Sequence, residues 1–222
     1  MAPQRIGIVV AEPSGDLLAA GLMDALRELL PAVQFEGVAG PLMRESGIDE
    51  WEPMDNLSVM GLFEVLQHLP RLLRLRSRLL ARWRGTPPLA FIGVDAPDFN
   101  LTLESRLREA GVPTVHYVSP TVWAWRTGRV KKIRRAVDLL LTIFPFETEF
   151  LAQRQVPAHY VGHPLAFDMT MEPDRKGARD ALGLAADAPV LALLPGSRGG
   201  EVSRIARPFL ETALALKQQL PD

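Results

Sequence analysis

The 222-residue sequence contains no cysteine. This absence excludes disulfide bonds and thiolate chemistry, and it is typical of a reducing compartment. Apolar runs of membrane-spanning length are also missing, and Glu12 and Asp16 end the first apolar run too early for a signal peptide. The formal net charge of -1 gives no overall preference for nucleic acid. We therefore expect a cytoplasmic protein that is either soluble or peripheral to a membrane.

Acidic residues are missing between Glu64 and Asp95. In the segment "LFEVLQHLPRLLRLRSRLLARW" (62–83), leucines recur at helical spacing and arginines occupy another face, and Pro70 is predicted to open the second of two helices. Such a basic amphipathic stretch can lie on an anionic membrane surface. It can also be a helix that faces the core and exposes its basic side to water. From the segment alone we favour the second interpretation.

A second basic segment, "VSPTVWAWRTGRVKKIRR" (118–135), alternates Trp123 and Trp125 with cations. This composition suits the stacked bases and phosphates of a nucleic acid. It suits a phosphorylated small molecule or a lipid headgroup equally well. Composition does not choose among these ligands.

Strand-length apolar runs alternate with helical patterns over most of the chain. The expected strands cover residues 5–11, 33–40, 88–97, 112–120, 138–145 and 158–164. The expected helices cover residues 15–30, 41–47, 100–111 and 146–155. This alternation predicts an α/β fold, with a Rossmann-like domain built on a parallel sheet over residues 1–165.

The remaining residues predict a linker and a new start. Residues 166–188 have no regular pattern, and a strand pattern (189–198) and a helix pattern (202–220) then follow. One strand and one helix cannot bury a core by themselves. We therefore expect residues 189–222 to be the first βα unit of a second, incomplete Rossmann-like domain.

Two turns at the ends of expected strands are candidate sites, because ligands of open α/β sheets bind at the carboxyl ends of strands. "AEPSGDL" (11–17) is either a ligand loop or a turn in which Asp16 caps the next helix. In "GVDAPDFN" (93–100), Asp95 or Asp98 could be a general base, and we favour Asp98. The alternative is that Asp98 caps a helix that begins near Asn100.

A third turn, "LLPGSRGGEV" (193–202), joins an expected strand to an expected helix. The free backbone N–H groups at such a helix start favour an anion, and Arg198 could add two hydrogen bonds to a phosphate. The turn is therefore a candidate diphosphate site, with an ordinary loop as the alternative.

The motifs, taken in order, resemble the lipid-A-disaccharide synthase family: "AEPSGDL", "FIGVDAPDFN", "HYVSPTVWAWR", "TIFPFE", "YVGHPL" and "LLPGSRGGEV". That family consists of inverting glycosyltransferases of GT-B architecture. The resemblance implies transfer of 2,3-diacylglucosamine from UDP-2,3-diacylglucosamine to 2,3-diacylglucosamine 1-phosphate, with release of UDP, in lipid A biosynthesis of Gram-negative bacteria. It implies no metal or other cofactor, no nucleic-acid partner, and a peripheral place on the cytoplasmic face of the inner membrane. The oligomeric state stays open.

The resemblance also implies roles for individual residues. Asp98 matches the proposed base, which takes the proton of the acceptor's 6-hydroxyl before that oxygen attacks the donor's anomeric carbon with inversion. The other candidate substrate contacts are Glu12, Ser14, Asp95, Asn100, Trp125, Arg126, Ser197 and Arg198, the last two near the donor diphosphate. The candidate membrane contacts are Leu66, Leu69, Leu72, Leu73, Arg71, Arg74 and Arg78.

The chain departs from the family in length. Family members continue well beyond residue 222, so the resemblance implies a C-terminally truncated chain that lacks most of the uridine-binding domain and is weakly active or inactive by itself. Two alternative functions are another GT-B enzyme acting on a UDP-N-acetylhexosamine and a non-catalytic module that binds an anionic membrane. The "VDAPDFN" and "VWAWR" motifs weigh against the first, and the strand-end carboxylates weigh against the second.

Overall fold

The structure, a computed structural model, describes residues 4–57, 62–124, 127–197 and 199–219. The side chains of residues 62–67 and 127 are outside this description. The chain divides into two compact units, Met1–Phe167 and Asp168–Asp222. Each unit is described separately below.

The first unit is built on a seven-stranded parallel sheet. Its strands are β1 (Arg5–Val9), β2 (Gln34–Ala39), β3 (Asp49–Pro53), β4 (Ala90–Val94), β5 (Thr114–Tyr117), β6 (Leu139–Thr142) and β7 (Ala158–Tyr160). The spatial order is β3-β2-β1-β4-β5-β6-β7, and all six pairings are parallel. The predicted α/β fold with a parallel sheet is therefore confirmed.

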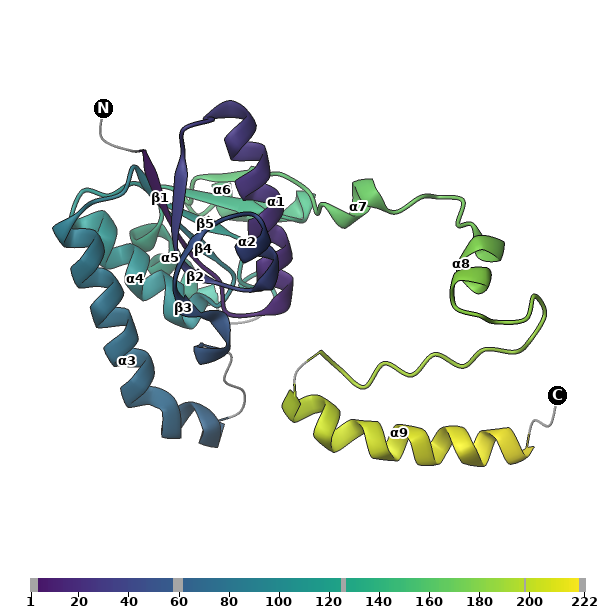
Figure 1. The fold of residues 1–222 in the computed structure, drawn as a ribbon. Coiled ribbons are helices and arrows are strands. Elements are labelled where there is room, and N and C mark those ends of the chain that lie inside the picture. Colours follow the sequence, from purple (N-terminus) through teal and green to yellow (C-terminus); the bar gives the residue numbers. More distant parts are fainter. Residues whose placement is uncertain (1–3, 58–61, 125–126, 198, 220–222) are drawn as a thin grey trace. The chain divides into compact units, whose positions relative to one another are not determined.

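Helices connect these strands and cover both faces of the sheet. They are α1 (Pro13–Leu29), α2 (Pro41–Glu45), α3 (Leu62–Gly85), α4 (Pro97–Glu109), α5 (Val130–Ala136) and α6 (Pro145–Ala152), with two 3₁₀ turns, η1 (Met54–Asn56) and η2 (Thr127–Arg129). A short helix, α7 (Leu165–Asp168), follows β7. Because crossovers between parallel strands are right-handed, reversing the direction of strand addition after β3 moves the following helices to the other face. Figure 1 shows this division, with α1 and α2 on one side and α3, α4 and α5 on the other.

Two details of the N-terminal half differ from the prediction. The strand β3 has the sequence "DEWEP", whose charges and proline hide a strand pattern but are typical of a sheet edge, where β3 lies. Helix α1 begins at Pro13 with Glu12 as its N-cap, so Asp16 does not cap it. The buried Asp16 carboxylate instead accepts hydrogen bonds from three backbone amides at the start of α2: those of Gly40 (3.2 Å), Leu42 (2.9 Å) and Met43 (3.1 Å).

Helix α3 is one continuous helix, so the prediction that Pro70 opens a second helix is wrong. Proline within a helix removes one backbone hydrogen bond, and here the packing of the C-terminal half offsets that loss. Leu75, Leu79 and Trp83 are buried there at helical spacing, and Trp83 Nε1 donates a hydrogen bond to Glu36 Oε1 at 3.0 Å. A Cβ atom at Gly7 of β1 would lie 2.8 Å from the Trp83 ring, so this close packing requires glycine.

The second unit contains α8 (Arg175–Ala181) and α9 (Gly199–Gln219). The strand expected over 189–198 is not formed: residues 189–196 have no regular structure, and Val190, Leu191 and Leu194 are exposed. A strand needs a hydrogen-bonded neighbour, and the described part of this unit supplies none. Among the described residues of the whole chain, no helix is both long enough and apolar enough to cross a membrane.

Candidate functional site

The turn that follows β4 is strained. Asp95 and Ala96 have φ angles of 50° and 43°, in the left-handed region that residues other than glycine rarely adopt. Each such residue costs about 1–3 kcal/mol, which the surrounding contacts must offset. Pro97 then begins α4, where its fixed φ suits the first helical position. Strain of this kind gathers at ligand-binding turns, which makes the segment Asp95–Asp98 a candidate site.

Asn100 holds this turn in place. The residue is fully buried, and its Nδ2 donates hydrogen bonds to the carbonyl oxygens of Val9 (3.4 Å), Val94 (3.3 Å) and Asp95 (2.9 Å). These carbonyls lie at the ends of β1 and β4, the neighbouring strands at which the strand order reverses. In open α/β sheets this reversal point forms the crevice that binds ligands. The observed contacts of Asn100 are therefore with the turn, and the residue lies beneath the site instead of facing a substrate as predicted.

A buried, hydrogen-bonded glutamate–histidine pair lies under the same turn. Glu104 of α4 and His116 of β5 are fully buried, with Glu104 Oε1 and His116 Nδ1 2.6 Å apart. Burial raises the pKa of Glu104, and His116 acts in the opposite direction. A Cβ atom at Gly93 would overlap Glu104 Oε1 and lie 2.9 Å from Asn100 Cβ. Glycine at the end of β4 therefore leaves the room that these polar side chains occupy.

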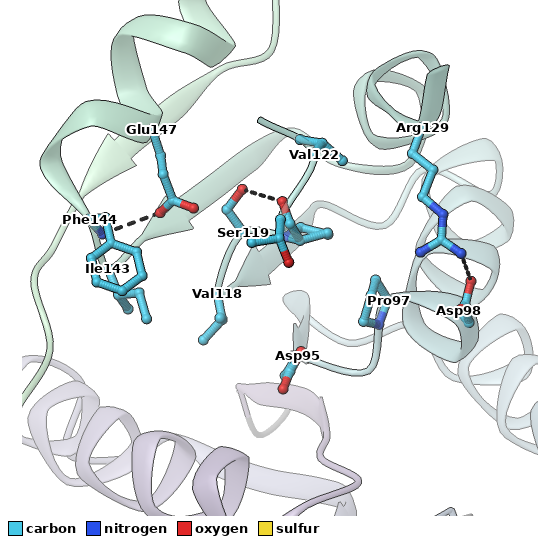
Figure 2. A pocket seen from close by; sticks show the side chains of 12 residues that line it. Asp95, Pro97, Asp98, Val118, Ser119, Val122, Arg129, Ile143, Phe144 and Glu147 are labelled. Carbon is cyan, nitrogen blue, oxygen red and sulfur yellow. Dashed lines mark hydrogen bonds and ion pairs between the residues drawn. The ribbon is translucent and has the colours of Figure 1, made fainter. Parts of the chain in front are cut away.

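Asp98 lies in the first turn of α4, and its side chain is 78% exposed. The N-cap of α4 is Ala96, and α4 begins at Pro97, so the alternative that Asp98 caps a helix starting near Asn100 is wrong. Arg129 Nη2 donates a hydrogen bond to Asp98 Oδ1 at 2.8 Å (Figure 2). The ion pair fixes the direction of an exposed carboxylate, which stays accessible to a ligand.

A cavity of about 470 Å³, which we call the β5 cavity, opens beside Asp98. Its volume is within the range of small-molecule sites. Half of its twelve lining residues are polar or charged: Asp95, Asp98, Ser119, Thr121, Arg129 and Glu147. Figure 2 shows Asp98 and Arg129 on one side of the cavity and Glu147 across from them. A ligand in this cavity would meet carboxylates, a guanidinium and a hydroxyl.

A second cavity of about 440 Å³, the α3 cavity, lies on the other side of the same turn. It shares Asp95, Pro97 and Asp98 with the β5 cavity. Its remaining walls are mostly apolar: Ala11, Leu57, Leu69, Leu72, Leu73, Ala96 and Phe99, together with Glu12 and Arg76. Burial lowers the pKa of Arg76, whose guanidinium lies 5.8 Å from the centre of the Phe99 ring. The apolar walls of this cavity could bind an apolar chain next to Asp98.

Glu147 is a candidate that the sequence interpretation missed. It is 2% exposed, lies in the first turn of α6, and lines the β5 cavity. Burial raises its pKa, although the hydrogen bond from the Phe144 amide and the nearby side chains of Trp123 and Ser119 act in the opposite direction. The signal in the sequence was the Pro-Phe-Glu that begins a helix directly after a strand, which places a carboxylate at the carboxyl edge of the sheet.

The other predicted substrate contacts are placed as follows. Glu12, half-buried, lines the α3 cavity, and Ser14 is exposed in the first turn of α1. Trp125, Arg126 and Arg198 lie outside the described residues. Ser197 belongs to the second unit, is exposed, and its amide donates a hydrogen bond to Glu201 Oε2 at 3.2 Å. The structure thus brings Asp98, Asp95 and Glu12 to one edge of the first unit's sheet.

The predicted membrane residues lie on α3 between residues 66 and 78, and the N-terminal half of this helix extends beyond the sheet in Figure 1. Leu69 and Leu73 are 40% and 45% exposed, and Leu72 is half-buried. The predicted arginines Arg71, Arg74 and Arg78 are also exposed. Arg78, however, donates a hydrogen bond to Glu52 at 3.0 Å, and the Leu66 side chain lies outside the description. Exposed leucines beside exposed arginines are therefore present over residues 69–74.

A family model and individual relatives both match this chain, and both identify the same family. A sequence model of the lipid-A-disaccharide synthetase family matches residues 6–222. The chain is 54% identical over 220 residues to the lipid-A-disaccharide synthase of Alkalilimnicola ehrlichii, covering 98% of this chain and 58% of that protein. It is also 54% identical over 221 residues to the lipid-A-disaccharide synthase of Pseudomonas fluorescens, covering 100% and 58%. The chain thus spans 58% of the length of these curated relatives.

A solved structure with a related arrangement is that of MurG from Acinetobacter baumannii. It superposes with a TM-score of 0.48 and 14% sequence identity, covering 89% of this chain and 54% of that one.

Proposed function

This chain belongs to the lipid-A-disaccharide synthetase family, and from that premise we propose that it forms the acceptor-side part of a lipid A glycosyltransferase. The proposed reaction transfers 2,3-diacylglucosamine from UDP-2,3-diacylglucosamine to 2,3-diacylglucosamine 1-phosphate and releases UDP. The observation that carries the proposal is the exposed Asp98 carboxylate, which lines a cavity at the reversal point of the sheet in a chain of this family.

Asp98 is the general base in this proposal. It takes the proton from the acceptor's 6-hydroxyl as that oxygen forms a bond to the donor's anomeric carbon. The bond from that carbon to the UDP oxygen breaks on the opposite face, and its electron pair leaves with UDP, which inverts the configuration. Arg129 directs the Asp98 carboxylate, and Asn100 fixes the strained turn that carries it. Asp95 and Glu12 border the same site, and neither is assigned a proton transfer.

The two cavities suit the two parts of each substrate. Sugars carry hydroxyl and amide groups, which the polar residues of the β5 cavity can bind. Acyl chains are apolar, and the leucines of the α3 cavity would shield them from water. The exposed residues Leu69, Leu73, Arg71 and Arg74 of α3 would then lie at the inner face of the inner membrane, where the arginines attract anionic lipids. We propose peripheral membrane contact through this part of the helix.

The donor side of the proposal involves the second unit. Gly196 has a φ of 113°, which favours glycine, and Ser197 follows it two residues before α9 begins at Gly199. We propose that Ser197 and Arg198 contact the donor diphosphate, and that Trp125 and Arg126 contact the acceptor. The chain covers 58% of the length of this relative, and we propose that residues of the kind found in the rest of that length are needed for full uridine binding.

The experiment compares Asp98→Asn with Asp95→Asn in the full-length protein. Asp98→Asn keeps the shape of the side chain but removes its basicity, so turnover should fall about 10²–10⁴-fold, the usual contribution of a general base. Because Asp98 is 78% exposed, the free energy of unfolding should hardly change. Asp95→Asn should mainly reduce stability, because Asp95 is half-buried in the strained turn. Full turnover by Asp98→Asn, with loss of turnover in a folded Asp95→Asn variant, would reverse the assignment.

A further inference from the structure

Glu147 occupies an unusual position for a carboxylate. It is almost completely buried, yet it lines the β5 cavity across from Asp98 and Arg129 (Figure 2). The amide of Phe144 donates a hydrogen bond to Glu147 Oε2 at 3.2 Å, which satisfies a free N–H group at the start of α6. A neutral glutamine oxygen could accept that hydrogen bond equally well. The helix start alone therefore does not require a buried charged group at this place.

Glu147 has polar neighbours at the same wall of the cavity. Ser119 also lines the β5 cavity, and its hydroxyl donates a hydrogen bond to the Pro120 carbonyl at 3.2 Å. The side chains of Ser119 and Trp123 lie close enough to Glu147 to oppose the effect of burial on its pKa. Ser119 and Trp123 come from the loop after β5, and Glu147 comes from α6. Two segments of the chain therefore bring polar side chains to this wall.

Three exposed aromatic rings pack together near the start of α6, the helix that carries Glu147. Trp123 and Phe146 pack edge to face with ring centres 5.0 Å apart, and Phe144 stacks on Phe146 at 5.7 Å. Their residues are 41%, 50% and 49% exposed, respectively. Phe144 lines the β5 cavity, so this aromatic group continues its wall outward. Exposed aromatic surface next to polar groups is typical of a ligand site.

We infer that Glu147, Ser119 and the aromatic group of Trp123, Phe144 and Phe146 form the subsite for the glucosamine ring of the acceptor. The inference rests on the proposed function, because Asp98 can act only if the ring that carries the 6-hydroxyl lies in the β5 cavity. A pyranose ring has C–H groups on its faces and hydroxyl groups at its edge. The C–H groups of the sugar can pack against aromatic faces, and its hydroxyl groups can donate charge-assisted hydrogen bonds to a carboxylate. Glu147 binds and orients the ring while Asp98 moves the proton.

The test uses Glu147→Gln in the full-length protein, with both acylated substrates varied separately. Glutamine keeps the acceptor for the Phe144 amide but removes the charge, so α6 should remain intact. We expect the KM for the acceptor to rise about tenfold or more, as for the loss of one charged hydrogen bond, while the KM for the UDP-linked donor stays within about twofold. Phe146→Ala should raise the acceptor KM by about two- to tenfold, because one exposed ring face is lost.

Glu149→Gln is the matched control. Glu149 lies on the same helix, is exposed, and does not line either cavity, so the same substitution there should leave both KM values unchanged. An unchanged acceptor KM in both Glu147→Gln and Phe146→Ala, or a change in the donor KM instead, would overturn the inference while the transferase activity of the wild type stands. Absence of any disaccharide product from the wild-type protein would overturn the proposed function, and the inference with it.

Discussion

The β5 cavity and the α3 cavity share the turn Asp95–Asp98, but their other walls have opposite character. The β5 cavity has Ser119, Arg129 and Glu147, whereas the α3 cavity has leucines of α3 and Phe99. The difference arises from topology. The loops after β5 and β6 bring polar groups to one side of the turn, while the long crossover from β3 to β4 lays an amphipathic helix on the other. One carboxylate is thereby exposed to a polar and an apolar environment at once.

In the proposed reaction, the sugar and the acyl chain of a substrate must both be bound next to the reacting hydroxyl. A single turn at the reversal point of the sheet would serve both parts. We expect the largest effect from a substitution beneath the turn that both cavities share, a smaller one from a substitution in the apolar wall of the α3 cavity, and the smallest from one in the polar wall of the β5 cavity.

Gly93→Ala should have the largest effect, because Gly93 packs against the buried side chains of Glu104 and Asn100 beneath the turn that both cavities share. The added Cβ would overlap Glu104 Oε1, and the buried Glu104–His116 pair has no room to move away. We expect a loss of about 3 kcal/mol or more in the free energy of unfolding, measured by urea denaturation. The matched control is Gly21→Ala in α1, where the Cβ would meet no atom within 4 Å. That variant should gain up to about 1 kcal/mol. Equal stability of the two variants would contradict the packing beneath the turn.

Leu73→Asp should distinguish the α3 cavity from the β5 cavity. Leu73 is 45% exposed, so we expect the free energy of unfolding to change by about 0.5 kcal/mol or less. The KM for substrates with long acyl chains should rise about tenfold, because an apolar contact with the chain is lost. The KM for short-chain analogues should hardly change. Leu29→Asp is the control, since Leu29 is 77% exposed on α1 and lines neither cavity. An equal loss with long and short chains would show that the α3 cavity does not hold the acyl chain.

Glu147→Gln should have a small, pH-dependent effect on stability. Burial raises the pKa of Glu147, so the folded state binds this proton more tightly than the unfolded chain does. The folded state therefore loses stability as the pH rises from the ordinary glutamate value of about 4.3 through the raised pKa. Glutamine has no such proton, so the variant should gain stability relative to the wild type across this window, with a constant difference above it. Thermal unfolding measured from pH 4 upward, in roughly half-unit steps, checks this sign. A difference that does not change with pH would mean that the carboxylate is not desolvated.

Much of the first unit could be predicted from sequence because its central strands β1, β2 and β4 are almost completely buried. Runs such as "RIGIVVA" and "PLAFIGVDAP" are therefore mostly apolar, and the parallel sheet observed over them confirms the predicted fold class. The edge strand β3 was missed because an edge strand carries charges and proline. The start of α4 was placed at Asn100 instead of Pro97, because two consecutive left-handed residues before Pro97 are not visible in a sequence pattern.

Other features depend on partners that lie far apart in the sequence. Asp16 looks like a cap for its own helix, but its hydrogen-bond partners at the start of α2 are 24 to 27 residues away. Residues 189–196 have the same apolar character as β4, yet they form no strand, because strand formation needs a neighbour. The motif around Asp98 predicted a candidate site at the turn Asp95–Asp98, which two cavities border in the structure. Glu147 was missed because it became a candidate only through its burial next to Ser119 and Trp123. The sequence pattern does not predict that a glutamate at this position is buried.

The central claim is that Asp98 removes the proton from the acceptor's 6-hydroxyl. The most direct measurement is an experimental structure of the full-length protein with 2,3-diacylglucosamine 1-phosphate bound. The account predicts that the acceptor's O6 lies about 2.6–3.2 Å from an Asp98 carboxylate oxygen, with the sugar ring in the β5 cavity. An O6 atom that contacts Asp95 or Glu147, with Asp98 still engaged only by Arg129, would contradict it.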